Sequence, residues 1–392
     1  MKNISDTEAY TVYDFVFSKA LRALSRVVGV RKLTKPFWNR WRASNIGDAT
    51  LFRFLDGVGS IDDWPSVGER IVAEEVAIFE KLRAGMKGPE TVDGLRRLSY
   101  LCNMAHWGAL PISDQKIRAY RQCRDYYIEA ESMAFGDRYR RVAFPWRGGP
   151  IHGNLHLPET SSAADRPAPL VIIVHGIDGC KEEHLATELA LAQAGLSVLG
   201  IDGPGQAEAL LLDGLRWTEE FHEIIACALD KLADDKRVDT HRVGLIGFSI
   251  GGMWAIRAAS GDARIKALYD LGGPINTRRF SSLPFLLKTK LCQVTGARDA
   301  RSIAEVLGKN SIEDDAILAG VSASVRMIHG ARDRVVSTAD KKWLRDRLLH
   351  FRPAADVSLE IIADGDHCCT GHSNWIRPDM VQFFIRTLRA RN

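Results

Sequence analysis

The sequence predicts an α/β fold in which helices cover both faces of a mostly parallel sheet, preceded by a region of helices alone. Up to about residue 135, apolar residues recur every three or four positions, which is typical of amphipathic helices. From about residue 136, short apolar strands alternate with helical segments. Because parallel strands need a crossover connection, usually a helix, this alternation predicts a parallel sheet. The 392 residues have room for two domains, which we place at residues 1–135 and 136–392.

Composition and charge exclude several classes of protein. Hydrophobic residues make up 46% and charged residues 26% of the chain, which suits a folded protein with a full core. The net charge is +4 and the charges are scattered, so no basic stripe predicts a nucleic-acid partner. The N-terminus lacks the apolar run of a secretory signal, and no stretch approaches the roughly 18 apolar residues of a membrane span. We therefore expect a cytoplasmic protein without nucleic-acid or membrane partners.

The N-terminal region is predicted to be helical throughout. Four of its segments show helical spacing: Tyr13–Val28, Ile71–Leu82, Val92–Met104 and Ile117–Met133. No strand-like alternation interrupts them, and the region is rich in aromatic residues and arginine. We expect these helices to pack as a cap on the domain that follows rather than to form a self-sufficient bundle.

A β-hairpin opens the second region, because residues 139–146 and 151–157 alternate on either side of a Gly-Gly turn. The strands that follow are predicted at Leu170–Val174, Ser197–Ile201, Arg242–Ile246, Ile265–Leu271, Ser324–His329 and Val357–Ile362. The helices are predicted at Glu182–Ala194, Thr218–Leu232 with Thr218 as its cap, Ile250–Ala259, Thr338–Leu349 and Trp375–Leu388. Residues 272–320 are too many for a simple connection, so small lid helices are expected there, over the carboxyl edge of the sheet.

A Gly-x-Ser-x-Gly motif, from Gly247 to Gly251, stands directly after an apolar strand and before a helix. A turn this sharp strains the central residue and brings neighbouring chains too close for a Cβ, which explains both glycines. The hydroxyl of Ser249 is thereby exposed above the sheet. A simple strand–turn–helix with a capping serine would show the same motif, so the function depends on what the rest of the chain supplies.

A serine nucleophile needs a base that takes its proton and an acid that orients the base. Asp333 and His367 each follow a predicted strand, in the chain order serine, acid, histidine that such a turn requires. Asp270, at the end of the preceding strand, is an alternative acid. We predict that Ser249, His367 and Asp333 form a catalytic triad.

The negative charge that develops on the attacked oxygen needs two backbone N–H donors. One is expected from Ile250, directly after the serine, and the other from Ile177, which follows His175-Gly176 at the end of a strand. Asp178 is the alternative donor if this loop is shifted by one residue. The side chains at these positions matter little because the donors belong to the main chain.

A metal site is not predicted. The seven cysteines contain no Cys-x-x-Cys pair. The sequence His367-Cys368-Cys369 with His372 holds zinc-ligand residue types, but adjacent cysteines rarely both reach one ion and the triad already accounts for the segment. We expect no metal and no other cofactor.

Five runs of sequence together resemble one branch of the α/β-hydrolases. They are residues 175–183, 202–206, 247–252, 329–333 and 365–369. The branch contains 2,6-dihydroxypseudooxynicotine hydrolase, the fungal yellowish-green pigment hydrolases that shorten polyketides, and the fermentation–respiration switch proteins. Within these runs, the Lys-Glu-Glu, Asp-Gly-Pro-Gly-Gln and Gly-Asp-His-Cys-Cys signatures are more specific than the serine motif.

The resemblance implies a helical cap over an α/β-hydrolase core, the same triad, a homodimer, and hydrolysis of a carbon–carbon bond beside a ketone. The chain departs from the branch in two places. Residues 272–298 contain no Asp or Glu, although the nicotine-pathway enzyme has an additional acidic residue about thirty positions after its nucleophile. Ala207 also stands where a glycine is usual after Gln206. The first departure disfavours the cationic substrate of that enzyme.

Carbon–carbon hydrolysis requires a leaving carbanion that a second carbonyl or a phenol ring can stabilise. We therefore expect a small-molecule substrate of the β-diketone or acyl-phenol type, as in polyketide or aromatic chemistry. A carboxylesterase or thioesterase would use the same residues on an easier leaving group. A binding protein without catalysis is the third hypothesis, since a fold does not fix a function.

The cap offers four candidate substrate contacts, which are His106, Trp107, Tyr120 and Tyr126. Aromatic residues on helices belong to a core more often than to a ligand site. The sequence leaves these two interpretations open.

Overall fold

The computed structural model describes residues 16–389 except 45, 111, 160–166, 279–282, 284 and 298–299. Within them, eight strands form one sheet in the order β1-β2-β4-β3-β5-β6-β7-β8. The strands are β1 (Tyr139–Trp146), β2 (Gly149–His156), β3 (Ala168–Val174), β4 (Ser197–Asp202), β5 (Val238–Phe248), β6 (Ile265–Leu271), β7 (Ser324–Gly330) and β8 (Val357–Ile362). The hairpin β1–β2 adds to β4 in antiparallel fashion, and the neighbours from β4 to β8 pair in parallel. The predicted α/β fold is confirmed.

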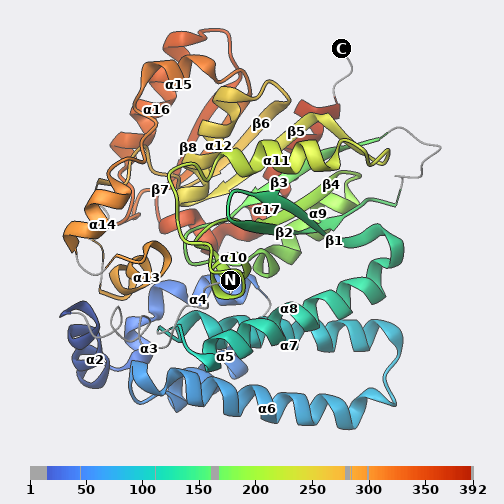
Figure 1. Ribbon diagram of the computed structural model, residues 1–392, viewed down its shortest axis with the longest axis vertical. Coiled ribbons are helices and arrows are strands. Elements are labelled where there is room, and N and C mark those ends of the chain that lie inside the picture. Colours follow the sequence, from blue (N-terminus) through green and yellow to red (C-terminus); the bar gives the residue numbers. More distant parts are fainter. Residues whose placement is uncertain are drawn as a thin grey trace.

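The strand β3 shows why the sheet is covered on both faces. All seven of its residues are buried. Leu170 and Ile172 belong to a core cluster that also contains residues of α11 (Glu223–Leu232), α12 (Ile250–Gly261) and α16 (Thr338–Phe351). Val171 and Ile173 point to the opposite face, where they pack with α9 (Leu185–Gln193) and α17 (Ser373–Arg389). Because successive side chains of a strand alternate between the faces, an unbroken apolar run becomes a strand between two helix layers (Figure 1).

The register of the parallel strands brings their carboxyl ends to one edge. Val174 at the end of β3 pairs with Ile201 of β4 and with Gly247 of β5. Gly247 pairs in turn with Asp270 of β6. The loops that follow these strands therefore meet at the same edge of the sheet, where the functional residues of open α/β sheets lie.

The helix predicted from Thr218 begins later than expected. The helix α11 starts at Glu223, and the hydroxyl of Thr218 instead accepts the backbone N–H of Glu220 at 3.3 Å in a local turn. This alternative hydrogen bond is typical of threonine near helix starts. A short helix that was not predicted, α10 (Ala207–Leu211), follows β4.

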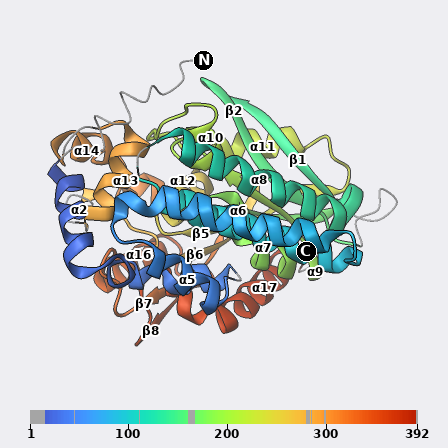
Figure 2. The ribbon, with the colours of Figure 1, turned by 90° about the horizontal axis from the view of Figure 1, so that it is seen from below.

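The N-terminal region is helical, as expected. Its helices are α2 (Val16–Val28), α3 (Val30–Leu33), α4 (Trp38–Ala43), α5 (Asp48–Gly57), α6 (Trp64–Arg83), α7 (Gly88–Gly108) and α8 (Asp114–Phe135), with single turns at Lys35–Phe37, Ile61–Asp63 and Gly136–Arg138. Figure 1 shows α6, α7 and α8 lying together below the sheet. Figure 2, seen from below, shows the same helices running across the molecule.

These helices share a core of their own. At its centre the rings of Trp41, Trp64 and Trp107 lie against one another, with centroids 5.3 to 6.1 Å apart. Tyr139, Leu185 and Leu286 are the buried residues that the later part of the chain adds to this cluster. Large aromatic side chains bury enough area to hold several helices together.

Residues 272–320 contain the expected small helices, α13 (Phe285–Thr295), α14 (Ala300–Leu307) and α15 (Asp315–Gly320). The helix α13 packs against α2, so this segment joins the N-terminal helices. Among the described helices, none has the length and apolar character that crossing a membrane requires.

Candidate active site

Ser249 occupies a strained turn between β5 and α12. Its φ is 52° and its ψ is −127°, a conformation that residues other than glycine rarely adopt. The glycines on either side of Ser249 are required because a larger side chain would collide with the neighbouring backbone. A Cβ on Gly251 would lie 2.0 Å from the carbonyl oxygen of Val174, and a Cβ on Gly247 would lie 2.3 Å from Cα of Gly252. The geometry matches the nucleophile turn of the α/β-hydrolases.

The structure brings Ser249, His367 and Asp333 together from three separate loops. The Oγ of Ser249 lies 2.8 Å from Nε2 of His367, and Nδ1 of His367 lies 2.8 Å from Oδ2 of Asp333. The other carboxylate oxygen of Asp333 accepts the backbone N–H groups of Val335 at 2.7 Å and Val336 at 3.0 Å. These two hydrogen bonds fix the orientation of the carboxylate that faces the imidazole.

The pKa directions suit a base and the acid that orients it. Burial opposes ionisation of Asp333, but the hydrogen bond and charge of His367 keep the pKa of the Asp333 carboxyl below its ordinary value. Burial also opposes charge on His367, and the neighbouring Cys368 and Asp333 nevertheless raise the pKa of the imidazole well above its ordinary value. The ionised carboxylate on the other side of the ring orients the imidazole and stabilises the imidazolium that forms when Nε2 takes the proton of a serine hydroxyl.

The alternative acid, Asp270, is engaged elsewhere. Its carboxylate forms a buried ion pair with Lys341, and Oδ1 accepts the backbone N–H of Gly273 at 2.8 Å. The geometry therefore favours Asp333 over Asp270 as the partner of His367.

The loop after β3 lies directly against the serine. A Cβ on Gly176 would lie 3.4 Å from Cβ of Ser249. The side-chain amide of Gln206 donates to the carbonyl oxygens of His175 at 3.0 Å and Gly176 at 2.9 Å. Because a trans peptide directs its N–H away from its C=O, holding the carbonyl of Gly176 also fixes the direction of the Ile177 N–H.

The second expected donor is at the start of α12. Ile250 is the first residue of this helix, and the first N–H groups of a helix have no partner within the helix. Ile177 and Asp178 line the same cavity as Ser249. The structure thus brings all three expected donor residues to the nucleophile, with Ile250 adjacent in the chain.

The side chain of Asp178 ties this loop to the N-terminal helices. Its carboxylate accepts from Nη1 of Arg40 at 3.0 Å and from Nε1 of Trp107 at 2.8 Å, and Nζ of Lys290 lies 3.5 Å away. Arg40 also pairs with Glu183 at 2.8 Å. Burial opposes ionisation of Asp178, but Arg40 and Lys290 hold the pKa of its carboxyl well below the ordinary value. The aspartate therefore stays charged.

A buried network of ion pairs and hydrogen bonds lies behind the loop. Two of the sequence signatures that carry the family resemblance supply several of its residues. The Nζ of Lys181 lies 2.9 Å from Asp202, 2.9 Å from Glu182 and 2.7 Å from Glu208. The other carboxylate oxygen of Asp202 lies 2.8 Å from Nε2 of His175. The Lys-Glu-Glu and Asp-Gly-Pro-Gly-Gln signatures thus hold the loop in place. Sequence reasoning used them only as marks of resemblance, although charged residues beside strand ends were a signal for such a network.

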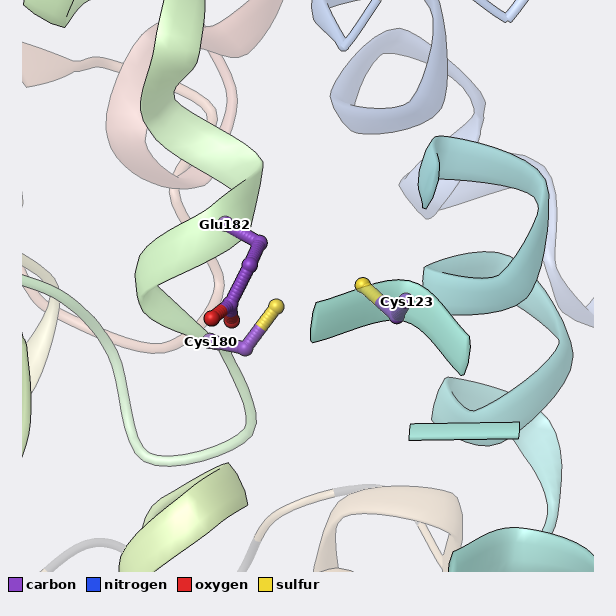
Figure 3. A group of neighbouring side chains, drawn as sticks. All are labelled: Cys123, Cys180 and Glu182. Carbon is purple, nitrogen blue, oxygen red and sulfur yellow. The ribbon is translucent and has the colours of Figure 1, made fainter. Parts of the chain in front are cut away.

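Two groups of side chains have the composition of a metal site, and their charge argues against it. Figure 3 shows Cys123 of α8 facing Cys180 and Glu182, with ligand atoms within 4.8 Å of one another. The second group is Glu182, Asp202 and Glu208. The ammonium group of Lys181 contacts the carboxylates of both groups. A cation at either place would face this buried positive charge, so we assign no metal to them.

A cavity of about 710 Å³ opens beside the serine. Both Ser249 and His367 are on its wall, and aliphatic side chains from α2, α13 and α17 cover much of the rest. Among these aliphatic residues are Leu21, Leu286, Leu291, Ile376 and Met380. The volume suits a small organic molecule.

The four aromatic residues expected to contact substrate do not line this cavity in the described part of the chain, which corrects that expectation. His106 is buried with its ring edge on Tyr120. Trp107 belongs to the tryptophan cluster and holds Asp178. The hydroxyl of Tyr120 donates to Asp202 at 3.0 Å within the buried network. Tyr126 is half-buried against the core of the N-terminal helices. Each ring is thus used for packing or for a buried hydrogen bond.

Comparisons with known proteins agree with this geometry. The model of the FrsA-like family, which is described as "Esterase FrsA-like", matches residues 87–333. This is more than half of the chain. The chain is 27% identical over 236 residues to 2,6-dihydropseudooxynicotine hydrolase of Paenarthrobacter nicotinovorans, covering 59% of each chain. It is 32% identical over 237 residues to Hydrolase LUC6 of a Fusarium species, covering 58% of this chain and 55% of that protein. The chain thus matches less than two thirds of the length of these relatives.

A solved structure with the same fold is that of 2,6-dihydroxy-pseudo-oxynicotine hydrolase. It superposes with a TM-score of 0.76 over 90% of this chain and 95% of the other, at 20% sequence identity. At this identity the likeness shows the fold alone, which is that of the α/β-hydrolases.

Proposed function

The chain belongs to the FrsA-like esterase family, and from this premise we propose that it is a serine hydrolase with the triad Ser249, His367 and Asp333. One observation carries the proposal. The serine hydroxyl, held in a strained turn on the wall of a cavity, lies 2.8 Å from an imidazole whose other nitrogen lies 2.8 Å from a buried carboxylate. This arrangement supplies a nucleophile, its base and the group that orients the base.

The reaction follows from the positions of these groups. Ser249 attacks the substrate carbonyl while His367 takes the hydroxyl proton, and Asp333 stabilises the imidazolium that forms. The N–H groups of Ile250 and Ile177 donate to the oxyanion, with Asp178 as the alternative to Ile177. The imidazolium then gives its proton to the leaving group. Water, activated by the same imidazole, releases the acyl group from the serine.

The proposed substrate is a β-diketone or an acyl-phenol of polyketide or aromatic type, cleaved at a carbon–carbon bond beside the ketone. In that case His367 delivers its proton to carbon, and the neighbouring carbonyl or phenol ring carries the charge of the leaving carbanion. The aliphatic cavity wall and the relative named as a pseudooxynicotine hydrolase support this choice.

The second candidate is a carboxylesterase or thioesterase, and the family's description as esterases favours it. The same triad would act on a leaving oxygen or sulfur. In both cases, residues 1–135 serve as a cap over a catalytic domain of residues 136–392, with lid helices between residues 272 and 320. The homodimer implied by the resemblance and the cytoplasmic location stay predictions.

Product analysis by mass spectrometry decides between the candidates. Wild type and Ser249→Ala are incubated with an aryl β-diketone and with an aryl ester of similar size. We expect the diketone to yield an acid and a ketone, with the rate reduced at least about 10³-fold in Ser249→Ala. Ser260→Ala, which changes a serine at the far end of the same helix, is the matched control and should retain the wild-type rate.

Cleavage of the ester alone would make the protein an esterase. Turnover by Ser249→Ala at the wild-type rate would contradict the serine mechanism for either substrate. Circular dichroism of each variant checks that its fold is retained.

A further inference from the structure

A half-buried arginine on the cavity wall has no hydrogen-bond or ion-pair partner among the described residues. Arg377 of α17 is half-buried and lines the cavity that holds Ser249. Its Nε is buried and makes no hydrogen bond. In the described part of the chain, its guanidinium forms no ion pair either.

The other buried cations described at this edge of the sheet have carboxylate partners. Arg40, on the same wall, pairs with Asp178 and Glu183. Lys181 contacts three carboxylates, and Lys341 pairs with Asp270. Buried charges are ordinarily paired because removing an ion from water is costly. An unpaired guanidinium inside a cavity is therefore the feature that requires an explanation.

The rest of the wall does not offset this charge. The loop after β7 places Arg332 and Arg334 on the same cavity, both exposed and neither paired with a carboxylate in the described chain. The remaining acidic group on the wall is Asp366, whose Oδ1 is buried without a partner. Burial raises the pKa of this carboxyl, and this single carboxyl is outnumbered by Arg332, Arg334 and Arg377. The cavity thus has an excess of positive charge at an otherwise largely aliphatic surface.

We propose that Arg377 binds a carboxylate carried by the substrate, so that the cavity selects molecules with one anionic group on an otherwise apolar body. This inference rests on the proposed function, since it assigns the substrate class of the same site. A guanidinium presents parallel N–H donors that match the two oxygens of a carboxylate. Among the described residues, Arg377 is the half-buried unpaired cation of this wall, whereas Arg332 and Arg334 are exposed. One such guanidinium among aliphatic side chains fits a single negative charge better than a phosphate dianion.

The substrate class follows for both candidate reactions. For carbon–carbon hydrolysis it is a β-diketone or acyl-phenol that bears a carboxylic acid. For ester hydrolysis it is the half ester of a dicarboxylic acid. In each, Arg377 holds the acid group while Ser249 attacks the carbonyl. The length of the substrate chain between its carboxylate and the attacked carbonyl therefore contributes to the specificity.

Turnover tests the assignment with matched pairs of 4-nitrophenyl esters. One member is the half ester of a dicarboxylic acid with four to ten carbons, and the other is the methyl-terminated ester of the same length. We expect wild type to prefer the acid form at one length. The ratio of kcat/KM for the acid to that for the neutral ester should fall at least tenfold in Arg377→Met and recover in part in Arg377→Lys.

The control is Arg386→Met, which removes an exposed arginine of the same helix that lies outside the cavity. Its ratio should equal that of wild type. A preference for the neutral ester at every length, or an equal loss for both esters in Arg377→Met, overturns the proposal.

A binding measurement separates this proposal from the proposed function, because it needs no turnover. The melting temperature of the Ser249→Ala protein is measured with hexanoate, hexanamide and inorganic phosphate. Hexanoate should raise it more than hexanamide does, and the difference should vanish in the Ser249→Ala, Arg377→Met double variant.

Equal effects of hexanoate and hexanamide overturn the proposal even if both esters are cleaved. An Arg377-dependent effect of phosphate without one of hexanoate overturns the choice of a carboxylate. If no ester is cleaved but hexanoate binds through Arg377, the proposed function fails and the anion site stands.

Discussion

The side chain of Gln206 is predicted to control catalysis without touching substrate. It is 1% exposed, and it accepts the N–H of Gly203 at 2.8 Å while donating to the carbonyls of His175 and Gly176. Gln206→Leu leaves two buried backbone groups unpaired, the carbonyl of His175 and the N–H of Gly203, at about 1 kcal/mol or more each, so we expect a loss of roughly 2 kcal/mol in the free energy of unfolding. The Gly176 carbonyl loses the amide donor of Gln206 and keeps its contacts with the N–H of Gly179 and with Nδ1 of His175, so the direction of the Ile177 N–H is held less firmly. Removal of one oxyanion donor costs about 10²–10³ in kcat, and a loosened donor should cost about 10- to 100-fold.

The assay separates the two effects of the Gln206 substitution. Urea unfolding gives the loss of stability, and kcat is measured on the best substrate well below the melting temperature. Gln206→Glu keeps an acceptor for the Gly203 N–H and loses both donors, so it should reproduce the fall in kcat. Tyr139→Phe is the control, because it loses a buried hydrogen bond of 3.0 Å to Asn154 away from the loop. A destabilised Gln206→Leu protein with the kcat of wild type would refute the reasoning.

Two further predictions concern the buried network and the serine turn. Burial opposes ionisation of Glu208, but Lys181 lowers the pKa of its carboxyl to about 2. A lowered folded-state pKa stabilises the protein above the unfolded value near 4.5, by roughly 3 kcal/mol, and this stability is lost as the pH falls toward 2. In Glu208→Gln the melting temperature should be lower at pH 7 and fall less between pH 5 and pH 2, and parallel curves for both proteins would contradict this. Gly251→Ala should prevent folding, because its Cβ would lie 2.0 Å from the oxygen of Val174, whereas Gly261→Ala meets nothing within 4 Å. Soluble Gly251→Ala protein with a wild-type melting temperature would contradict the steric argument.

The features that follow from local chain geometry could be predicted from the sequence. Alternation and buried apolar runs identified the strands, because a strand between two helix layers has no polar face. The candidates Asp333 and His367 followed from their places after predicted strands and from the chain order serine, acid, histidine. The structure places both at Ser249, which is the geometry that the prediction requires.

The features that depend on contacts distant in sequence could not be predicted in this way. The short helices α3, α4 and α5 have too few turns to show a clear period. The cavity wall is made of leucines and isoleucines from helices far apart in the chain, and such residues look like any core residue. Trp107 and Tyr120 were expected to contact substrate and do not line the cavity. The sequence shows an aromatic residue on a helix, but neither its hydrogen-bond partner nor the surface that its ring covers. Arg377 was not predicted from the sequence. What distinguishes it is the lack of an acidic neighbour among the described residues, and neighbours in space are visible only in the structure.

The contact between Arg40 and Asp178 has a consequence for engineering this fold. Asp178 is adjacent to Ile177 in the loop after β3. This loop is therefore anchored by a side chain from the first helices of the chain, that of Arg40. The two halves of the protein are therefore not interchangeable modules. A chimaera that joins this core to the helices of a relative would need a cation at the position of Arg40. Without that cation, Asp178 would keep Lys290, whose ammonium group lies 3.5 Å away, as its cationic partner.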